Sequence, residues 1–536
     1  MPLLSESLTG HVKALRNAAR QGMFRRIRRG IEKEGLRADA QGRISAVHHP
    51  HGLGSKLTHP HITTDYSESL LEYITPVYCR PKDALAFLGD LHRYTFRQLD
   101  GEWVWPASMP CRLSGNDSVP IADYGSSNSG IMKKVYRHGL DARYGRIMQS
   151  IAGIHYNFSL PDALWPVLQS LEGAEHVSLE TFRSRRYFDL IRNFRRNSWL
   201  LLYLFGGSPA IDESFLDGRD SELPRHGKRT RLSSSACSLR MSDLGYQNKV
   251  QDQLRICFNS LENYINTLRH AITARWPAYE ALGVQDEQGE WKQLNANILQ
   301  IENEYYSDIR PKRVARHNET PTQALEAGGV EYIEVRCLDL DPFEPLGISE
   351  TQIRFLDAFL VWCLLSPSPK VSDRECDQLD LNRTRVVAHG RDPELTLLVD
   401  GNEVSMRDQA RHVLGSMGAV AELLDEGDAG APHQAAITAL APLLDNAALT
   451  PAGRMEAALR DSGEEFTDWA LSQAKMYTDR LAAEPMDRAR ESLLKELTDT
   501  SHQQQGDIEQ DETVDFATFL ESYFEKASEP RVARRD

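Results

Sequence analysis

Two glutamates separated by one residue, Glu32 and Glu34, lie in the segment RGIEKEGLRA (residues 29–38). If this segment is a strand, both carboxylates point to the same face, because side chains alternate with a period of two. Like charges this close repel each other, so the arrangement requires a nearby positive charge. The pattern therefore indicates chemistry that involves a bound cation.

Further charged and polar side chains share one face in three other strand-like segments, at residues 61–77, 151–160 and 330–340. The first of these segments is typical of a hairpin, and the other two alternate polar with apolar residues. The side chains concerned are Asp65, Glu72, His155, Asn157, Ser159, Glu334 and Arg336. If the four segments line one cleft, their carboxylates and the histidine form an oxygen-rich set that favours Mg²⁺ or Mn²⁺.

Each pattern also has a simpler interpretation. Alternating glutamates on an antiparallel strand are typical of a solvated face, and His155 alone is typical of a surface or hydrogen-bonded histidine. Glu334 and Arg336 could form a cross-strand ion pair, and Asp65 could cap a turn. The cation hypothesis therefore depends on the segments being brought together.

The composition narrows the class of protein. The 536 residues include 62 basic and 77 acidic side chains, and the net charge of −15 argues against nucleic acid or an anionic membrane as partner. No apolar run is long enough for a membrane span, and the first 22 residues are typical of an amphipathic helix rather than a signal peptide. The seven cysteines are scattered without a CxxC pair, which predicts reduced thiols and a cytoplasmic location.

The periodicity of apolar residues changes along the chain. Up to about residue 345, strand-like segments alternate with helical ones, whereas the pattern is almost wholly helical from about residue 350. The predicted strands are residues 29–38, 43–47, 61–66, 70–77, 151–160, 294–306 and 330–340, and helices are predicted at 6–21 and 82–99. The sequence therefore predicts an α+β fold followed by a helical region.

These changes suggest three regions: an N-terminal helix at 1–28, a catalytic domain at 29–365 and a mainly helical C-terminal region at 366–536. Two polar stretches with few apolar residues, 223–236 and 501–512, are predicted to be mobile.

Eight motifs resemble, in this order, those of the proteobacterial-type glutamate–cysteine ligases. They are RGIEKEGLRA, TTDYSESLLEYITPV, LHRYT…WPASMPC, YGSSNSG, RYGRIMQSIAGIHYNFSLP, SLRMSDLGY, LQIENEYYSDIRPKR and GGVEYIEVRCLDLDPF. The resemblance covers residues 28 to 365, approximately, and is looser beyond. It implies a curved antiparallel sheet that forms a funnel, similar to the catalytic domain of glutamine synthetase, with flanking helices.

The resemblance also implies a reaction. The family joins the γ-carboxylate of L-glutamate to the amine of L-cysteine, with ATP as co-substrate and γ-glutamyl phosphate as intermediate, in the first step of glutathione biosynthesis. The implied cofactor is Mg²⁺, with Mn²⁺ as the alternative. The implied metal ligands are Glu34, Asp65 and Glu72 for one ion and Glu32, His155 and Glu334 for another, with a shared third ion also compatible.

Roles for other residues follow from the same resemblance. Glu334 and Arg336 are the implied catalytic residues. The implied phosphate-binding residues are Arg310, Lys312, Arg313 and Arg336, and the implied substrate-binding residues are Tyr66, Tyr136, Gln149, Asn157, Arg240, Tyr246 and Tyr306. Tyr246 and Tyr306 are expected near the cysteine carboxylate. The alternatives are ordinary core packing for the tyrosines and a solvated basic loop for residues 310–313.

Two other functions are also compatible with the sequence. Another ATP-dependent γ-glutamyl–amine ligase of the same fold would share the acidic strands but not the cysteine pocket. A non-catalytic regulatory protein on a ligase fold would be expected to lack at least one metal residue. We expect a monomer that acts on small molecules, without a nucleic-acid or membrane partner.

Overall fold

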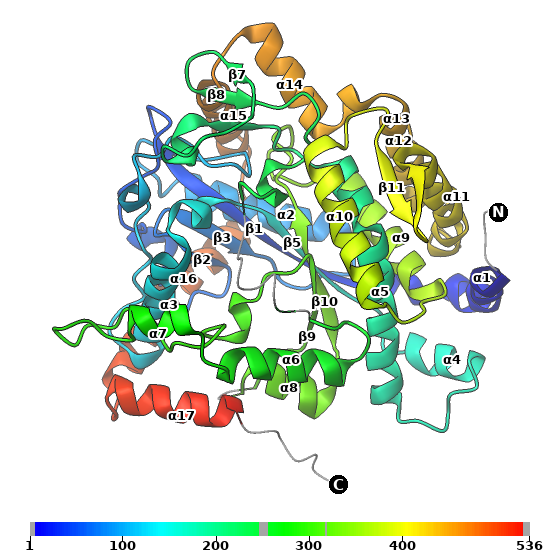
Figure 1. Cartoon of the computed structure of the whole chain (residues 1–536), viewed down its shortest axis with the longest axis horizontal. Helices are drawn as coiled ribbons and strands as arrows, with labels where there is room; N and C mark the ends of the chain where they lie inside the picture. Colours follow the sequence, from blue (N-terminus) through cyan, green and yellow to red (C-terminus); the bar gives the residue numbers. More distant parts are fainter. Residues whose placement is uncertain (1–5, 246–253, 255, 317–318, 529–536) are drawn as a thin grey trace.

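The computed structural model describes residues 6–245, 254, 256–316 and 319–528. Within them, seven strands form an antiparallel sheet in the order β2-β3-β1-β5-β10-β9, and β4 pairs with the far end of β1. The strands are β1 (Arg28–Asp39), β2 (Ile62–Thr64), β3 (Leu70–Ile74), β4 (Glu102–Val104), β5 (Ile154–Ser159), β9 (Ile309–Lys312) and β10 (Tyr332–Leu338). Figure 1 shows β1 and β5 crossing the middle of the molecule. The long strand β1 thus lies between the strands that carry the other acidic residues.

The period of two on β1 separates two environments. Ile31 is buried on one face, and Lys33 on the same face places its Nζ 2.6 Å from Nε2 of His92 in helix α2 (Pro81–Phe96). Burial lowers the pKa of Lys33 to about 7. Glu32 and Glu34 therefore point to the opposite face, away from this helix.

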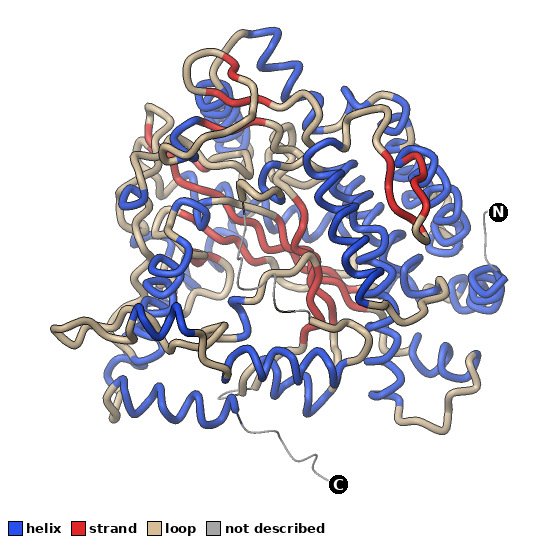
Figure 2. Tube along the Cα trace, viewed as in Figure 1, coloured by secondary structure: helices blue, strands red, loops and turns tan. Residues whose placement is uncertain are grey.

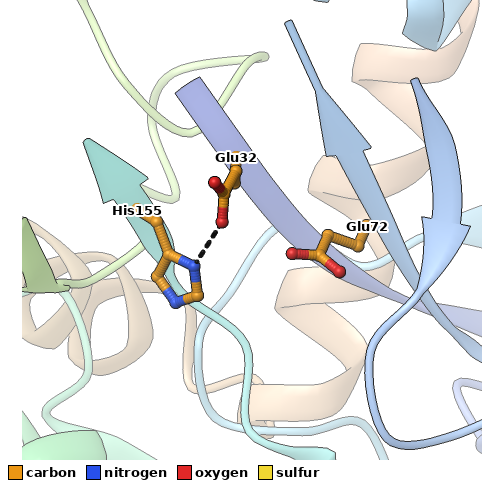
Figure 3. A group of neighbouring side chains, drawn as sticks. All are labelled: Glu32, Glu72 and His155. Atoms are coloured by element: carbon orange, nitrogen blue, oxygen red, sulfur yellow. Dashed lines mark hydrogen bonds and ion pairs between the residues drawn. The ribbon is translucent and has the colours of Figure 1, made fainter. Parts of the chain in front are cut away.

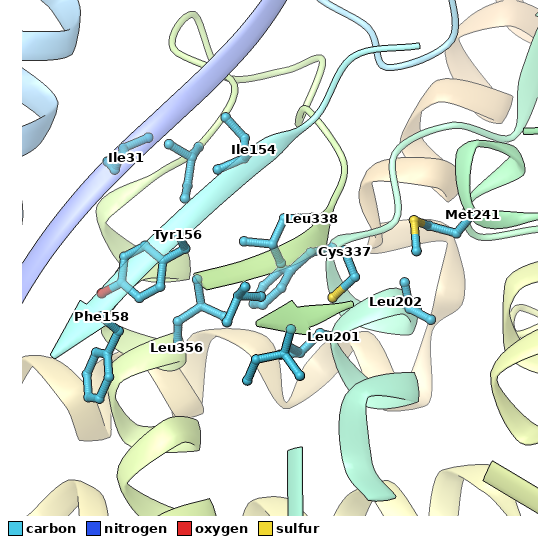
Figure 4. Packing of buried hydrophobic residues seen from close by; sticks show 14 of the residues in the cluster. Ile31, Ile154, Tyr156, Phe158, Leu201, Leu202, Met241, Cys337, Leu338 and Leu356 are labelled. Atoms are coloured by element: carbon cyan, nitrogen blue, oxygen red, sulfur yellow. The ribbon is translucent and has the colours of Figure 1, made fainter. Parts of the chain in front are cut away.

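The apolar face of the sheet packs on two long helices, α5 (Leu179–Phe205) and α9 (Glu350–Leu365). Figure 4 shows Tyr156 and Phe158 of β5 beside Leu356 of α9, with Cys337 of β10 close to Leu201 of α5. These side chains are buried, and removing them from water stabilises the fold by roughly 1.5–3 kcal/mol for each large apolar group. This core fixes the strands whose other face carries the polar residues.

The remaining helices surround the sheet (Figures 1 and 2). They are α1 (Glu6–Arg20), α3 (Asn128–Tyr144), α4 (Leu164–Leu171), α6 (Leu261–Thr273), α7 (Pro277–Leu282), α8 (Pro321–Gly328), α10 (Asp373–His389), α11 (Met406–Leu424), α12 (Pro432–Leu440), α13 (Pro442–Asp445), α14 (Pro451–Ser462), α15 (Phe466–Ala483), α16 (Arg488–Gln510) and α17 (Phe516–Ser528). In the C-terminal region, α10 packs on α5, α15 on α2, and α17 on α3 and α6. No helix within the described residues is long and apolar enough to cross a lipid bilayer.

Most of the predicted elements are confirmed. The hairpin appears as β2 and β3, the segments 151–160 and 330–340 contain β5 and β10, and the two predicted helices are α1 and α2. The α+β class with a helical C-terminal region is confirmed as well.

Two predicted strands are wrong. Residues 43–47 form single bridges rather than a strand. Residues 294–306 contain a single bridge, from Asn297 to Arg275, and a short 3-10 turn instead of a strand. Side chains satisfy part of the backbone: Gln300 Oε1 accepts from the Leu294 amide at 3.0 Å, and Glu304 Oε2 accepts from the Gln300 amide at 2.6 Å. A backbone that is satisfied in this way does not need a neighbouring strand.

Both stretches that were predicted to be mobile have regular structure instead. Residues 223–236 contain β7 (Arg225–His226) and β8 (Thr230–Leu232), and β8 lies between β7 and β6 (Ala210–Asp212) in a three-stranded sheet. Glu465 accepts hydrogen bonds from three consecutive amides there. Most of 501–512 belongs to α16, where Ser501 accepts a hydrogen bond from the Ser55 amide at 2.9 Å. Tertiary contacts supply the stability that the polar composition lacks.

A small antiparallel pair, β11 (Thr396–Val399) and β12 (Asn402–Ser405), completes the fold.

A buried polar network lies behind the sheet. Asp357 of α9 forms an ion pair with Arg29 at 2.7 Å and accepts a hydrogen bond from the Tyr156 hydroxyl at 2.7 Å. His433 of α12 lies 3.7 Å from Asp357 and 2.6 Å from Asp425. The network ties β1 and β5 to the C-terminal helices.

This network predicts a pH-dependent contribution to stability. Burial alone would lower the pKa of His433, but Asp357 and Asp425 raise it above its ordinary value. Since the folded pKa lies above the unfolded value of about 6.5, this stabilisation is present below that pH and is lost as the pH rises through the folded pKa. We expect the melting-temperature difference between wild type and His433→Gln to be larger at pH 6 than at pH 8.5. An equal difference at both pH values would contradict the role of the protonated imidazole.

Candidate active site

The register of the sheet brings a first group of ligand-type side chains together. Glu32 lies opposite His155 across the β1–β5 pair, and Glu34 lies opposite Glu72 across the β1–β3 pair. Oxygen and nitrogen atoms of Glu32, Glu72 and His155 lie within 4.8 Å of one another, and these side chains point toward a common space (Figure 3). A hydrogen bond of 3.0 Å joins His155 Nδ1 to Glu32 Oε2.

Three further predicted residues adjoin this group. His155 Nε2 lies 3.4 Å from Glu34 Oε1, and His155 Nδ1 lies 3.8 Å from Glu334 Oε1. Asn157 Nδ2 donates to Glu32 Oε1 at 2.8 Å. The side chains of Glu34 and His155 are only 9% and 6% exposed, so the interpretations as a solvated face and as a surface histidine are wrong here.

The two ends of the acidic cluster differ in how much positive charge lies beside the carboxylates. Burial raises the pKa of Glu72 well above its ordinary value, and the charges of Glu32, Asp65 and Glu34 add to this effect. Burial also raises the pKa of Glu34. At this end of the cluster, the carboxylates need additional positive charge to be ionised together.

The end of the cluster at Glu334 already has positive partners. Arg336 Nη1 lies 3.0 Å from Glu334 Oε1 and Lys312 Nζ lies 3.5 Å from Oε2. Burial would raise the pKa of Glu334, but Lys312 and Arg336 hold it well below its ordinary value. Burial would also raise the pKa of Glu32, but the hydrogen bond from His155 keeps this pKa below its ordinary value. Glu334 thus forms an ion pair with Lys312 of the neighbouring strand β9 and another with Arg336 of its own strand, so the simpler interpretation as a cross-strand ion-pair element also holds for Glu334.

A cavity of about 600 Å³ opens beside the cluster. The predicted site residues that line it are Glu34, Asp65, Tyr66, Tyr136, Gln149, Tyr306, Arg310 and Arg336. Carboxylates and arginines therefore face one space, which has room for small anionic substrates.

Other predicted residues lie elsewhere. Arg240 is buried and does not line the cavity, but its charge opposes the rise that burial causes in the pKa of Glu34 and of Tyr306, and its Nη2 donates to the Arg336 carbonyl at 3.1 Å. Arg313 donates to the carbonyls of Gly328 and Gly329 and is not brought to the cavity. Tyr246 lies outside the described residues.

Sequence reasoning missed several residues of the cavity wall. Arg137 of α3 donates to the Asp65 carbonyl at 2.8 Å, which fixes the loop that carries Asp65. Helix α10 adds Asp380 and Arg383 from the region to which no site residue was assigned. The helical spacing of these α10 residues indicates a shared face, but no sequence signal shows which surface that face meets.

An antiparallel sheet that presents clustered carboxylates, with arginines across one cavity, fits the class of ATP-dependent ligases, in which acidic side chains bind metal ions and basic side chains neutralise phosphate charge. A family model described as glutamate-cysteine ligase matches residues 12–386. The chain belongs to the glutamate–cysteine ligase family.

Similar proteins cover nearly the whole chain. The glutamate–cysteine ligase of Pseudomonas aeruginosa (strain LESB58) is 47% identical over 520 residues, which cover 97% of this chain and 98% of that protein. That of Pseudomonas putida (strain W619) is 47% identical and covers 92% of this chain and 94% of that protein.

Solved structures agree with the sequence relatives. The glutamate–cysteine ligase of Francisella tularensis, solved in complex with AMP, superposes with a TM-score of 0.88 at 34% identity and covers 94% of this chain and 98% of that chain. A bifunctional glutathione synthetase from Pasteurella multocida gives a TM-score of 0.69 at 25% identity, covering 89% of this chain and 55% of that chain. The protein therefore catalyses the ATP-dependent formation of γ-glutamylcysteine from L-glutamate and L-cysteine, the first step of glutathione synthesis.

Proposed function

We propose that the acidic cluster holds Mg²⁺, with Mn²⁺ as the alternative, and that the reaction passes through γ-glutamyl phosphate. Glu34, Asp65 and Glu72 form one proposed ligand set, and Glu32, His155 and Glu334 form the other. The grouping of Glu32, Glu72 and His155 within 4.8 Å supports ligands shared between the two sets. The donor set also fits, since carboxylate oxygens with one imidazole suit a hard divalent ion.

The side chains around the cavity would have separate roles in the reaction. A carboxylate is a poor electrophile, so the γ-carboxylate of glutamate must be activated by phosphorylation before an amine attacks it. Arg336 and Arg310, which line the cavity, neutralise charge on the transferring phosphoryl group, and Lys312 supports them beside Glu334. Bound Mg²⁺ would supply further neutralisation of phosphate charge.

The acceptor would bind at the tyrosine-rich part of the cavity. Tyr66, Tyr136 and Gln149 are proposed to line the side of the cysteine thiol, and Tyr306 to lie near the cysteine carboxylate. Tyr246 keeps the same proposed role from the family resemblance alone. Arg240, whose guanidinium bonds to the Arg336 carbonyl, would act as a positioning residue.

Asn157 would also act indirectly rather than by contact with substrate. Its amide donates to Glu32 at 2.8 Å, and it lies opposite Glu334 in the sheet. Asn157 would thereby orient the carboxylate of Glu32.

The observation that carries the proposal is the acidic cluster at the edge of a cavity with arginines. The test is an ADP-release assay on the full-length protein with Mg²⁺, ATP and L-glutamate, in which L-cysteine is compared with ammonia as acceptor. We expect release that depends on L-cysteine and on the divalent ion. Turnover that persists in excess chelator would contradict the metal role, and a preference for ammonia would favour a different γ-glutamyl ligase.

Ligand binding should stabilise the protein. Because Mg²⁺ and ATP are expected to bind only the folded state, concentrations 100 times the Kd should stabilise it by about 2.7 kcal/mol and raise the melting temperature. The measurement is a thermal melt with Mg²⁺ and ATP together, each ligand alone serving as the control. Superimposable melting curves at saturating concentrations would show that the cleft does not bind them.

We propose further that the enzyme works as a cytoplasmic monomer. The seven cysteines, all within the described residues, are unpaired, which supports a reducing compartment. Sedimentation at working concentration would test the oligomeric state.

A further inference from the structure

Helix α10 of the C-terminal region forms part of the cavity wall. Its lining residues are Asp373, Cys376, Asp377, Asp380, Arg383 and Thr384. They recur at intervals of three and four residues, so they share one face of the helix. The helix packs on α5, which holds this face against the cavity. Residues far from the acidic strands in sequence are thus placed to contact a substrate.

Arg383 differs from the other arginines of the site in its partners. Arg336 pairs with Glu334 at 3.0 Å, and Arg310 donates to the carbonyls of Asn303 and Tyr305. Within the described part of the chain, Arg383 makes no hydrogen bond, and its ion pair with Asp308 is long, at 3.9 Å. Its side chain is 31% exposed and lines the cavity, so its donors are available to an anion there.

The position of Arg383 indicates which end of the cavity it serves. Its partner Asp308 follows Tyr306 by two residues in the chain and also lines the cavity. Tyr306 lines the same cavity. Arg383 therefore lies on the Tyr306 side of the site, whereas Lys312 lies on the Glu334 side.

We propose that Arg383 binds the carboxylate of the acceptor amino acid and thereby selects an α-amino acid over a simple amine. A guanidinium presents two parallel N–H donors that match a carboxylate, and such charge-assisted bonds are stronger than neutral ones. The long pair with Asp308 leaves the guanidinium able to turn toward the substrate. This inference rests on the proposed acceptor end of the cavity.

The test compares two acceptors that differ in the carboxylate alone: L-cysteine and cysteamine. Arg383→Gln should raise the KM for L-cysteine about 10- to 100-fold, since one charge-assisted contact is lost, while kcat/KM for cysteamine and the KM values for ATP and L-glutamate stay unchanged. Arg383→Lys should recover part of the loss. The matched control is Arg385→Gln on the same helix, because Arg385 pairs with Glu403 at 3.0 Å and does not line the cavity.

Several results would overturn the inference. These are an unchanged KM for L-cysteine in Arg383→Gln, an equal loss with cysteamine, or a loss confined to ATP or glutamate. Thermal melts of both variants check folding. Calorimetric binding of L-cysteine to the full-length protein, with glutamate and a non-hydrolysable ATP analogue present, reports on Arg383 without turnover. Failure of the proposed phosphorylation mechanism would leave the calorimetric difference between wild type and Arg383→Gln intact, so the two failures are distinguishable.

Discussion

Replacing Glu72 with glutamine is expected to leave a folded enzyme that has lost about 100- to 1,000-fold of its activity. The fold should persist because Glu72 is crowded by Glu32, Glu34 and Asp65, and a neutral amide removes this repulsion. The activity should fall because a displaced metal ligand weakens charge stabilisation in the transition state, which contributes several kcal/mol. Steady-state ADP release and a thermal melt without Mg²⁺ are the measurements.

The loss should be accompanied by weaker stabilisation by Mg²⁺ and ATP in the melt. Glu331→Gln provides a matched control, because Glu331 is exposed beside β10 and does not line the cavity. Near-normal turnover of Glu72→Gln would remove Glu72 from the metal site. A large drop in melting temperature without Mg²⁺ would instead show that the carboxylate stabilises the apo fold.

Replacing Arg336 with alanine is expected to lower kcat about 100-fold for every acceptor. Arg336 lines the cavity, and its pKa is raised by Glu334, Glu34 and Glu32 even though burial opposes this, so it carries its charge throughout. If that charge stabilises phosphoryl transfer, the step that becomes slower comes before the attack of the acceptor. The loss of kcat therefore does not depend on which amine attacks. The measurement is kcat with L-cysteine and with cysteamine.

The contrast with Arg313 sharpens this test. The Arg313 guanidinium is bound to backbone carbonyls at the end of α8, so Arg313→Ala should change the melting temperature more than kcat. Arg336→Lys should recover part of the activity, because it restores the charge without the planar donor geometry. A change in the cysteine KM alone for Arg336→Ala would move this residue to the acceptor end.

Much of the candidate site could be predicted from the sequence because it lies on strands. The alternation that places Glu32 and Glu34 on one face is a property of any extended chain, and the same holds for Glu334 and Arg336. The apolar residues next to them, such as Ile31 and Val335, are buried and fix which face turns inward. Strand identity and the facing of side chains are therefore local properties that the residues themselves determined.

The pairing of the strands was decided by the tertiary structure. Glu32 meets His155, which is 123 residues away, because β1 pairs with β5, and nothing in either segment specifies that register. The segment 294–306 has the periodicity of a strand, yet side-chain amides satisfy part of its backbone, and within the described residues it forms only a single bridge, between Asn297 and Arg275. Long-range partners override a local preference when they satisfy the same hydrogen-bonding groups.

The C-terminal region shows most clearly what the sequence determines and what only the tertiary structure decides. Its helices follow from apolar periodicity, and the sequence by itself determined that they form. The charged face of α10 is compatible with solvent, with another helix or with a cavity, because helix formation does not depend on what its polar face meets. Only the packing of α10 on α5 decided that Arg383 lines the substrate cavity, since that contact depends on the shapes of two surfaces distant in sequence.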